Sequence, residues 1–463
     1  MAGDAPNLVL IMTDHQRHDS IGMVQAGREV CPNLNRLAKR SYHFRRAYCA
    51  APLCAPARTA MFTGKYPTLN GVVYNDFEGK TAQDHKVFQE YLSEAGYEVA
   101  HVGIDHVKVR PPYRRRVPFV LWVSNEEHDR YLAENVTDEP YPEPESFTKE
   151  IELAQFGERV RRRFSNTRTA VWPFAAEHFL DSYWCRCAAE FLRRPHERPF
   201  ALFLFLWAPH PPLRVPEPYA SAFDPDALDL PANVGLTPGD EAAGRRNGIA
   251  GQLGAGVTME EWRKVWAAHL GLVNLADAGI GQVLASLHEA GLEDSTIVTF
   301  TVDHGDMLGQ RCMYQKFEMY EPAVCTPWLL HLRGSVGSQR SDVPVSHLDI
   351  MPTLHELMGL PPPEGASGIS LASCVRRAAQ PPERPVFCEF CGSVGKDMDR
   401  RAVISHRYKY VYDPKGNSEL YDLQDDPLEL HNLAADPRHA DTLRLMHDEA
   451  RSWAKTHNDW LAF

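Results

Sequence analysis

The segment Pro6-Asn7-Leu8-Val9-Leu10-Ile11-Met12-Thr13-Asp14 indicates the fold class of this chain. Residues 8–12 are all apolar, which is too continuous for a strand with one solvated face. We therefore expect a central strand that is buried on both faces and ends at an aspartate. Three further apolar runs have the same character, and they cover residues 99–102, 200–206 and 297–302.

Helix-like patterns lie between these runs. They cover residues 32–40, 86–95, 178–194, 259–290 and 348–358. Alternation of strand and helix predicts an α/β sandwich, in which helices flank a large, mostly parallel sheet. Ligand sites in such sheets lie beyond the carboxyl ends of the strands. Four polar residues follow the apolar runs and are expected to converge there: Asp14, His106, His210 and Asp303.

A cysteine starts the next informative stretch, Cys54-Ala55-Pro56-Ala57-Arg58. Pro56 favours the first turn of a helix and Gly64 favours its end, so Cys54 and Arg58 share one helix face. A helix N-terminus with a fixed positive charge suits an anion such as sulfate or phosphate. These five residues are equally compatible with a small buried hydrophobe at a helix start.

The same stretch, followed by Thr63-Gly64-Lys65-Tyr66-Pro67, resembles the signature of the type I sulfatases of the alkaline phosphatase superfamily. Other blocks resemble the family in the family's order. They are the first strand with Asp14, Pro32-Asn33-Leu34, Trp207-Ala208-Pro209-His210-Pro211-Pro212, Thr301-Val302-Asp303-His304-Gly305-Asp306 with Lys316, Val345-Ser346-His347-Leu348-Asp349, and Glu419-Leu420-Tyr421-Asp422. Together they span nearly the whole chain, so the resemblance implies an alkaline-phosphatase-like sandwich.

The resemblance also implies a cofactor and a maturation partner. In the family a maturation enzyme oxidises the cysteine to formylglycine, here at Cys54, and the metal ligands correspond to Asp14, Cys54, Asp303 and His304. The position after the first aspartate, commonly a second acidic ligand, is His15 in this chain. Calcium is the metal that the family implies, and a nitrogen donor at His15 makes manganese or magnesium more plausible than usual.

The remaining site residues of the family map onto basic and polar positions. Arg58, His210 and Lys316 would hold the anionic oxygens of the ester, with His210 or Lys316 donating a proton to the departing alcohol. His106 matches the histidine that contacts the formylglycine hydroxyl, and Asn75 is expected to line the pocket. Ile104 stands where the family has a sulfate-binding lysine, so one cationic contact is missing.

Length and composition bound the remaining expectations. The 463 residues exceed one ordinary core, so we expect a catalytic α/β domain over 1–365, with insertions at about 111–173 and 213–257 that wall the site. Residues 366–463 are expected to form a small C-terminal α+β subdomain with a short antiparallel sheet. Its strands are expected at 402–412 and 418–423 and its closing helix at 437–461.

Charge and hydropathy limit the classes of binding partner and the cellular location that we expect. A formal net charge of −12 disfavours nucleic-acid binding. No stretch approaches the roughly 18 apolar residues that are needed to span a bilayer, and no signal peptide is visible, so the expected location is the cytoplasm. The ten cysteines lack the spacing of a disulfide scaffold and are expected to be reduced.

Three functions are compatible with this sequence. The leading prediction is a sulfatase that cleaves a sulfate monoester of a small molecule or saccharide. The second is a phosphonate monoester or phosphodiester hydrolase on the same scaffold, favoured by Asn75 and Ile104. The third is a catalytically silent member that binds sulfated ligands. A homo-oligomer is compatible with all three.

Overall fold

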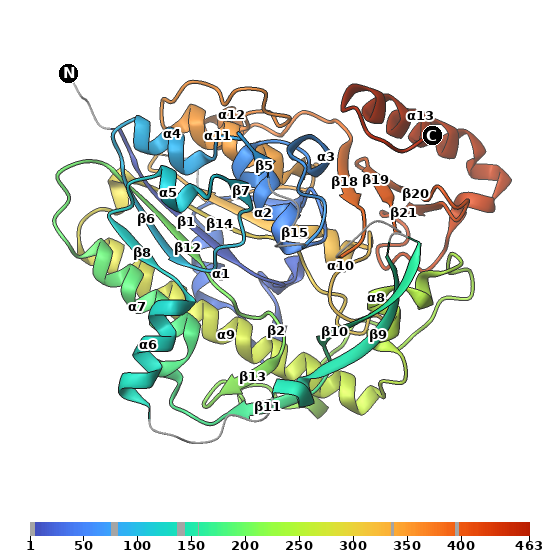
Figure 1. Ribbon diagram of the computed structural model, residues 1–463, viewed down its shortest axis with the longest axis horizontal. Coiled ribbons are helices and arrows are strands. Elements are labelled where there is room, and N and C mark those ends of the chain that lie inside the picture. The colour runs from blue at the N-terminus through green and yellow to red at the C-terminus, as the bar shows by residue number, and fades with distance from the viewer. Residues whose placement is uncertain (1–4, 76–81, 137–143, 156, 335–337, 394–397) are drawn as a thin grey trace.

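The computed structural model describes residues 5–75, 82–136, 144–155, 157–334, 338–393 and 398–463. A large sheet runs through the centre of the chain (Figure 1), with the strand order β16-β4-β15-β14-β1-β12-β6-β8 and β17 paired to β4. Its strands are β1 (Asn7–Thr13), β4 (Tyr42–Tyr48), β6 (Glu98–Gly103), β8 (Leu121–Val123), β12 (Phe200–Phe205), β14 (Thr296–Val302), β15 (Cys325–His331), β16 (Gln339–Ser341) and β17 (Val345–Ser346).

The four expected apolar strands form the middle of this sheet. β14, β1, β12, β6 and β8 are parallel, and β15 is antiparallel to both of its neighbours. Every residue of β1, β12 and β14 is buried. Each large apolar side chain buried in this way contributes on the order of 1.5–3 kcal/mol. The predicted sandwich with a mostly parallel sheet is confirmed.

Helices cover both faces of the sheet (Figure 1). In one group α2 contacts α4 and α11, and in another α9 contacts α1 and α7. The helices of the chain are α1 (Pro32–Ala38), α2 (Cys54–Thr63), α3 (Pro67–Asn70), α4 (Phe88–Glu94), α5 (Tyr113–Arg116), α6 (Asn125–Asn135), α7 (Leu180–Leu192), α8 (Ile249–Gly254), α9 (Met259–Glu289), α10 (Glu321–Val324), α11 (Ile350–Leu357), α12 (Ala372–Arg377) and α13 (Ala440–Thr456).

The helix α9 corrects one expectation from the sequence. By length and composition it is apolar enough to cross a membrane, whereas no such segment was expected. The segment is apolar because it packs inside the fold, where 72% of its most apolar window is buried. It contacts α1, α7 and the strand β13 (Leu213–Pro216).

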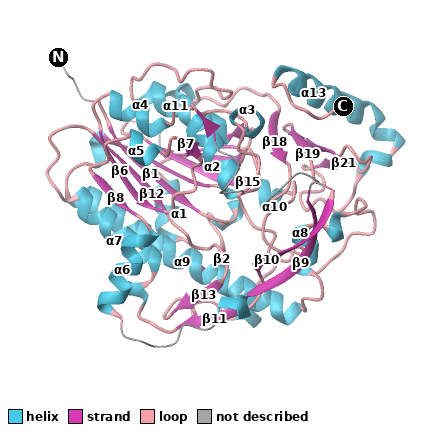
Figure 2. Cartoon of the chain, viewed as in Figure 1, coloured by secondary structure: helices cyan, strands magenta, loops and turns pink. Residues whose placement is uncertain are grey.

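The C-terminal part forms a separate four-stranded antiparallel sheet (Figure 2), in the order β18-β19-β20-β21. Its strands are β18 (Val386–Phe390), β19 (Arg400–Ile404), β20 (Tyr408–Tyr412) and β21 (Glu419–Asp422), and α13 packs against β19 and β20. The single strand expected over 402–412 is wrong. The polar turn at 405–407 divides it into β19 and β20, which pair as a hairpin.

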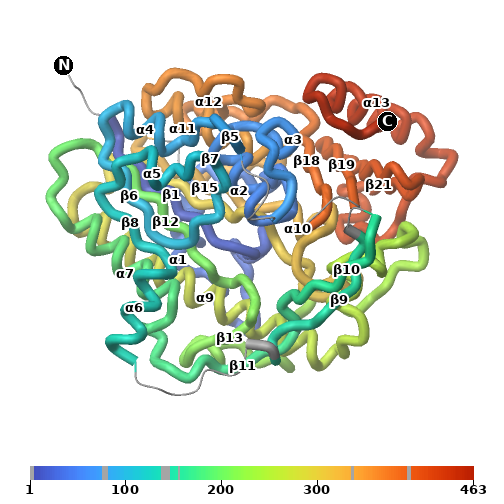
Figure 3. Tube along the Cα trace, in the orientation of Figure 1, coloured from blue at the N-terminus to red at the C-terminus, as the bar shows by residue number. Residues whose placement is uncertain are grey.

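The segment 111–173 also differs from expectation, because it contributes more than an insertion. Its strand β8 is the edge strand of the large sheet, paired in parallel to β6. The segment then forms a hairpin of β9 (Thr148–Gln155) and β10 (Glu158–Ser165), which lies beside α8 (Figure 3), and ends in β11 (Thr169–Trp172). The short pairs β2 (Val24–Gln25) with β3 (Arg28–Glu29) and β5 (Ala82–Gln83) with β7 (Val109–Arg110) complete the strands.

Candidate active site

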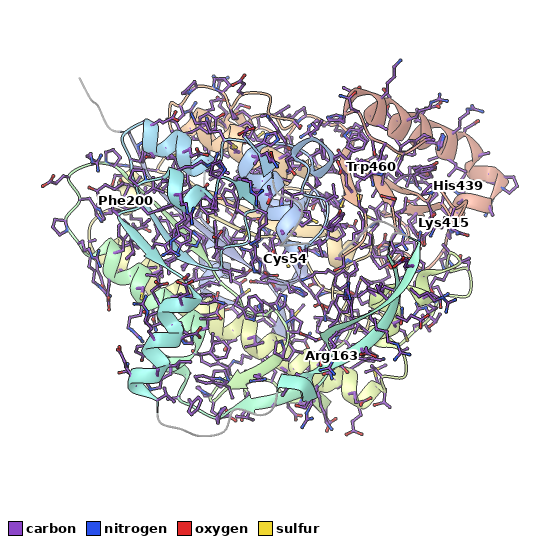
Figure 4. The ribbon with its side chains drawn as sticks, in the orientation of Figure 1. Cys54, Arg163, Phe200, Lys415, His439 and Trp460 are labelled. Atoms are coloured by element: carbon purple, nitrogen blue, oxygen red, sulfur yellow. The ribbon has the colours of Figure 1, made fainter. Side chains whose placement is uncertain are left out.

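The N-terminus of α2 positions Cys54 near the middle of the molecule (Figure 4), beyond the carboxyl ends of the parallel strands. All ten residues of α2 are buried, and the helix ends at Gly64, whose φ of 67° is left-handed. Cys54 is the first helical residue and Arg58 lies one turn later on the same face. The backbone N–H of Ala55 donates to Oδ1 of Asn75 at 3.0 Å, which satisfies one of the free donors at this helix end.

Two strand ends bring carboxylates and an imidazole to Cys54. The Cys54 thiol donates to Oδ1 of Asp14 at 3.7 Å, and its Sγ lies 3.1 Å from Nε2 of His304. His304 Nε2 also lies 3.8 Å from Oδ2 of Asp303. The ligand atoms of these four residues lie within 4.8 Å of one another, and we call them the four-ligand group: Asp14, Cys54, Asp303 and His304.

The donor set of the four-ligand group fits a divalent cation. All four residues are buried, and burial together with the neighbouring Asp303 raises the pKa of Asp14 to about 7. Two carboxylates brought together away from water repel each other, and a cation between them removes this cost. Two carboxylates and one imidazole are ordinary ligands for calcium, magnesium or manganese, whereas the Cys54 thiol is a soft donor.

Arg58 joins the two carboxylates instead of projecting freely toward a substrate. Its Nε donates to Oδ2 of Asp303 at 2.8 Å, and its Nη2 donates to Oδ2 of Asp14 at 3.0 Å. Although burial opposes ionisation, Arg58 holds the pKa of Asp303 well below its usual range. Nη1 of Arg58 is buried and has no hydrogen-bond partner among the described residues, so it remains able to bind an anionic oxygen.

Lys316 contacts Cys54 directly, within a chain of polar groups. Its Nζ donates to Sγ of Cys54 at 2.9 Å and to Nε2 of His15 at 2.6 Å, and lies 3.5 Å from Nε2 of His210. Burial disfavours the ammonium, but Cys54 and Asp14 outweigh burial and raise the pKa of Lys316. Lys316 therefore remains charged beside residue 54.

His15 is held by Asp306 and Lys316. Its Nδ1 lies 2.7 Å from Oδ2 of Asp306, while burial and the charge of Lys316 lower its pKa well below the usual value. The neutral ring accepts from Lys316 at Nε2, so its proton is on Nδ1, facing Asp306. His15 belongs to a second set of potential ligands, with Asp14, Cys54 and His210, and not to the four-ligand group. Its role as a ligand stays a prediction.

Partly exposed residues form the rim of the site. His106, Asn75 and His210 are only partly buried. The ring centroid of Trp207 lies 4.0 Å from that of His210 and 6.2 Å from that of His106. Ile104, where a lysine was expected, is buried and apolar.

The structure thus brings together most of the predicted site residues, with Asn75 at the helix end and His106 at the rim. It also adds two carboxylates that the sequence reasoning did not select. Asp306 stands in the same block as Asp303 and His304, which was an available signal. Asp181 accepts the backbone N–H groups of Trp207 and Ala208 at 2.7 and 3.0 Å and so anchors the loop that carries His210. Asp181 lies inside α7, where no sequence pattern indicated a role in the site.

Comparison with known proteins places this site in a family. The sequence profile described as Sulfatase matches residues 6–360, and one described as N-sulphoglucosamine sulphohydrolase, C-terminal, matches residues 309–456. A choline-sulfatase of Rhizobium meliloti (strain 1021) is 27% identical over 458 residues, which cover 95% of this chain and 84% of that protein.

Two further similarities concern the wider superfamily. A multifunctional alkaline phosphatase superfamily protein of Trinickia caryophylli is 27% identical over 508 residues, covering 98% of this chain and 96% of that protein. The structure of a phosphonate monoester hydrolase from Silicibacter pomeroyi shares the fold with a TM-score of 0.80 at 24% identity, covering 98% of this chain and 96% of that chain. The profile match over residues 6–360 shows that this chain belongs to the sulfatase family, the sulfuric ester hydrolases of the alkaline phosphatase superfamily.

Proposed function

We propose that this chain hydrolyses an organic sulfate monoester to an alcohol and inorganic sulfate, with formylglycine formed from Cys54 and with a divalent cation. The observation that carries this proposal is the placement of Cys54. Its Sγ lies within 3.1 Å of both His304 Nε2 and Lys316 Nζ, at the tip of α2 and beside two buried carboxylates. A thiol that only filled space would not need this surrounding of charged groups.

Asp14, Asp303, His304 and residue 54 would hold the cation. Calcium is our first choice because the carboxylates are hard oxygen donors, with manganese and magnesium as alternatives. When bound, the cation would neutralise the carboxylates and favour ionisation of a hydroxyl on residue 54. Conversion of Cys54 to formylglycine replaces the soft sulfur with oxygen, which matches the other ligands. This proposal makes a formylglycine-generating enzyme a partner of the chain.

The chain's own residues supply binding and proton transfer. Nη1 of Arg58, which is buried without a hydrogen-bond partner among the described residues, and Nζ of Lys316, 2.9 Å from Cys54 Sγ, are able to bind sulfate oxygens. Burial and the charge of Lys316 lower the pKa of His210 well below its usual value, so its ring is neutral. Lys316 is therefore the better donor of the proton that the departing alkoxide oxygen takes up. The proton of the His210 ring is on Nδ1, which faces the carbonyl oxygen of Pro211, so Nε2 of His210 is an acceptor toward Lys316.

A second candidate function is hydrolysis of phosphonate monoesters or phosphodiesters. It is supported by Ile104, which is buried and apolar where sulfatases have a sulfate-binding lysine. Parallel kinetics on phenyl sulfate and on a phenyl phosphonate monoester test the ranking, with Cys54→Ala as the control. We expect a higher kcat/KM for the sulfate and no turnover by Cys54→Ala. A higher kcat/KM for the phosphonate would reverse the two candidates. Binding without turnover of either ester by the natural protein would favour a silent, ligand-binding member.

A further inference from the structure

A cavity of about 410 Å³ lies beside His210, outside the four-ligand group. Its wall is formed by residues of α6, by β11 and the start of α7, by the loop at 207–214 and by α9. None of the site residues predicted from the sequence lies in this wall except His210.

His210 belongs both to the cavity wall and to the surroundings of the reaction centre. Asp14, Cys54 and Lys316 are buried, whereas His210 is partly exposed and lines the cavity. Nε2 of the same residue lies 3.5 Å from Lys316 Nζ. A group attached to an ester oxygen beside Lys316 would therefore extend past His210 into the cavity.

The lining of the cavity is mainly apolar and aromatic. The rings of Trp172 and Phe179 meet edge to face at 5.2 Å, and Trp207 lines the same cavity. Leu132 and Leu272 add aliphatic surface. Such walls favour flat or bulky apolar groups, which gain from burial and from ring contacts.

The charges at the cavity argue against a charged substrate group. Asp129 and Arg214 both line it, and their charges are opposite. A cationic group would be attracted by Asp129 and repelled by Arg214, and an anionic group the reverse, so the pair favours neither sign of charge. A saccharide also needs many free hydrogen-bonding groups, but Nε2 of His128 already contacts the carbonyl oxygen of His178 at 2.9 Å.

We propose that this cavity is the subsite for the alcohol part of the ester, and that it selects a neutral, ring-bearing alcohol, aromatic or alicyclic. This inference rests on the proposed function, because it takes the ester to be bound at residue 54. It goes beyond that function by naming the class of alcohol.

Calorimetric binding to the Cys54→Ala protein tests the subsite without requiring turnover. The probes are 2-naphthyl sulfate, methyl sulfate and choline sulfate. We expect 2-naphthyl sulfate to bind at least about tenfold more tightly than either of the others, as burial of a ring allows. Equal affinities, or tighter binding of choline sulfate, would overturn the proposal.

A matched pair of variants on α6 tests whether the preference for 2-naphthyl sulfate arises at this cavity. Leu132→Arg places a long charged side chain at the cavity wall, and Ala133→Arg places the same side chain on the exposed neighbouring position. Leu132→Arg should remove the preference for 2-naphthyl sulfate, and Ala133→Arg should keep it. Loss of the preference in both variants, or in neither, would contradict the subsite. Turnover of phenyl sulfate by the unmutated protein decides the proposed function separately.

Discussion

Asp306 Oδ2 lies 2.7 Å from Nδ1 of His15, and the opposite nitrogen of that ring accepts from Lys316 Nζ at 2.6 Å. Asp306 is itself fixed, because its Oδ1 accepts the backbone N–H groups of Leu308 and Gln315 at 2.9 and 3.0 Å. The backbone thus orients a carboxylate, which orients an imidazole, which orients the lysine beside residue 54.

Asp306→Asn tests this chain of contacts. If Oδ1 keeps its two backbone partners, the new amide N–H₂ faces His15 Nδ1 and requires the proton of the ring to move to Nε2, against the ammonium of Lys316. We expect kcat to fall by about 10- to 100-fold, with KM for phenyl sulfate nearly unchanged. An unchanged kcat would show that Asp306 does not position Lys316.

Asp303→Asn tests the four-ligand group, with Asp306→Asn as its matched control in the same loop. Removal of one carboxylate charge should greatly reduce the divalent metal that copurifies with the protein, as measured by mass spectrometry of the elements. Asp306→Asn should keep its metal, because Asp306 contacts His15 and is not in the group. Equal metal contents in the two variants would argue against these ligands.

Much of the fold was predictable because its strands are buried on both faces. The runs at 8–12 and 200–206 have no polar residue, the run at 297–302 has only two threonines among its apolar residues, and the structure places the three side by side. The edge strand β8 was missed because it has only three residues within a segment rich in charge and proline. The hairpin of β9 and β10 was missed for a similar reason, since most of β10 is exposed and polar.

The site residues that directly follow a buried strand were predictable from the sequence, and the contacts among the other site residues were less so. Asp14 and Asp303 each follow a buried strand, and the parallel pairing of β1 with β14 brings them together. The hydrogen bond between His15 and Asp306 joins residues that are 291 positions apart, so no local sequence pattern could indicate it. The use of Arg58 to bridge two carboxylates likewise depends on the packing of α2 against those strand ends.

Asn75→Ala and Asn75→Asp distinguish a role of this side chain in capping α2 from a role in contacting the substrate. Asn75 Oδ1 accepts from the Ala55 N–H at the start of α2, so its loss in Asn75→Ala should lower the free energy of unfolding by about 1 kcal/mol. Asn75→Asp keeps an acceptor and should keep the stability. If the side chain also faces the substrate, the added charge in Asn75→Asp raises KM for an anionic ester. An unchanged KM would show that Asn75 caps the helix and does not contact the substrate.

Asp181→Asn should change how stability depends on pH. Burial raises the pKa of Asp181 to about 6 from 3.8, so the folded protein retains a proton that the unfolded chain releases in this range. Stability of the unmutated protein therefore falls as pH rises from about 4 to about 6, and the full penalty, about 3 kcal/mol, is present above it.

The amide in Asp181→Asn does not titrate, and its oxygen still accepts from Trp207 and Ala208. Its unfolding free energy, measured by chemical denaturation, should exceed that of the unmutated protein by a difference that grows between pH 4 and pH 7. The same pH dependence in both proteins would show that Asp181 does not carry the penalty.

Conversion of Cys54 is the central claim, and mass spectrometry of the proteolytic peptide that contains residue 54 measures it directly. The protein should be produced together with a formylglycine-generating enzyme, and the peptide then compared with that of Cys54→Ala. Our account predicts a peptide that has lost the sulfur and two hydrogens of Cys54 and gained one oxygen, and that forms an adduct with a hydrazine. An intact thiol in protein that hydrolyses phenyl sulfate would contradict it.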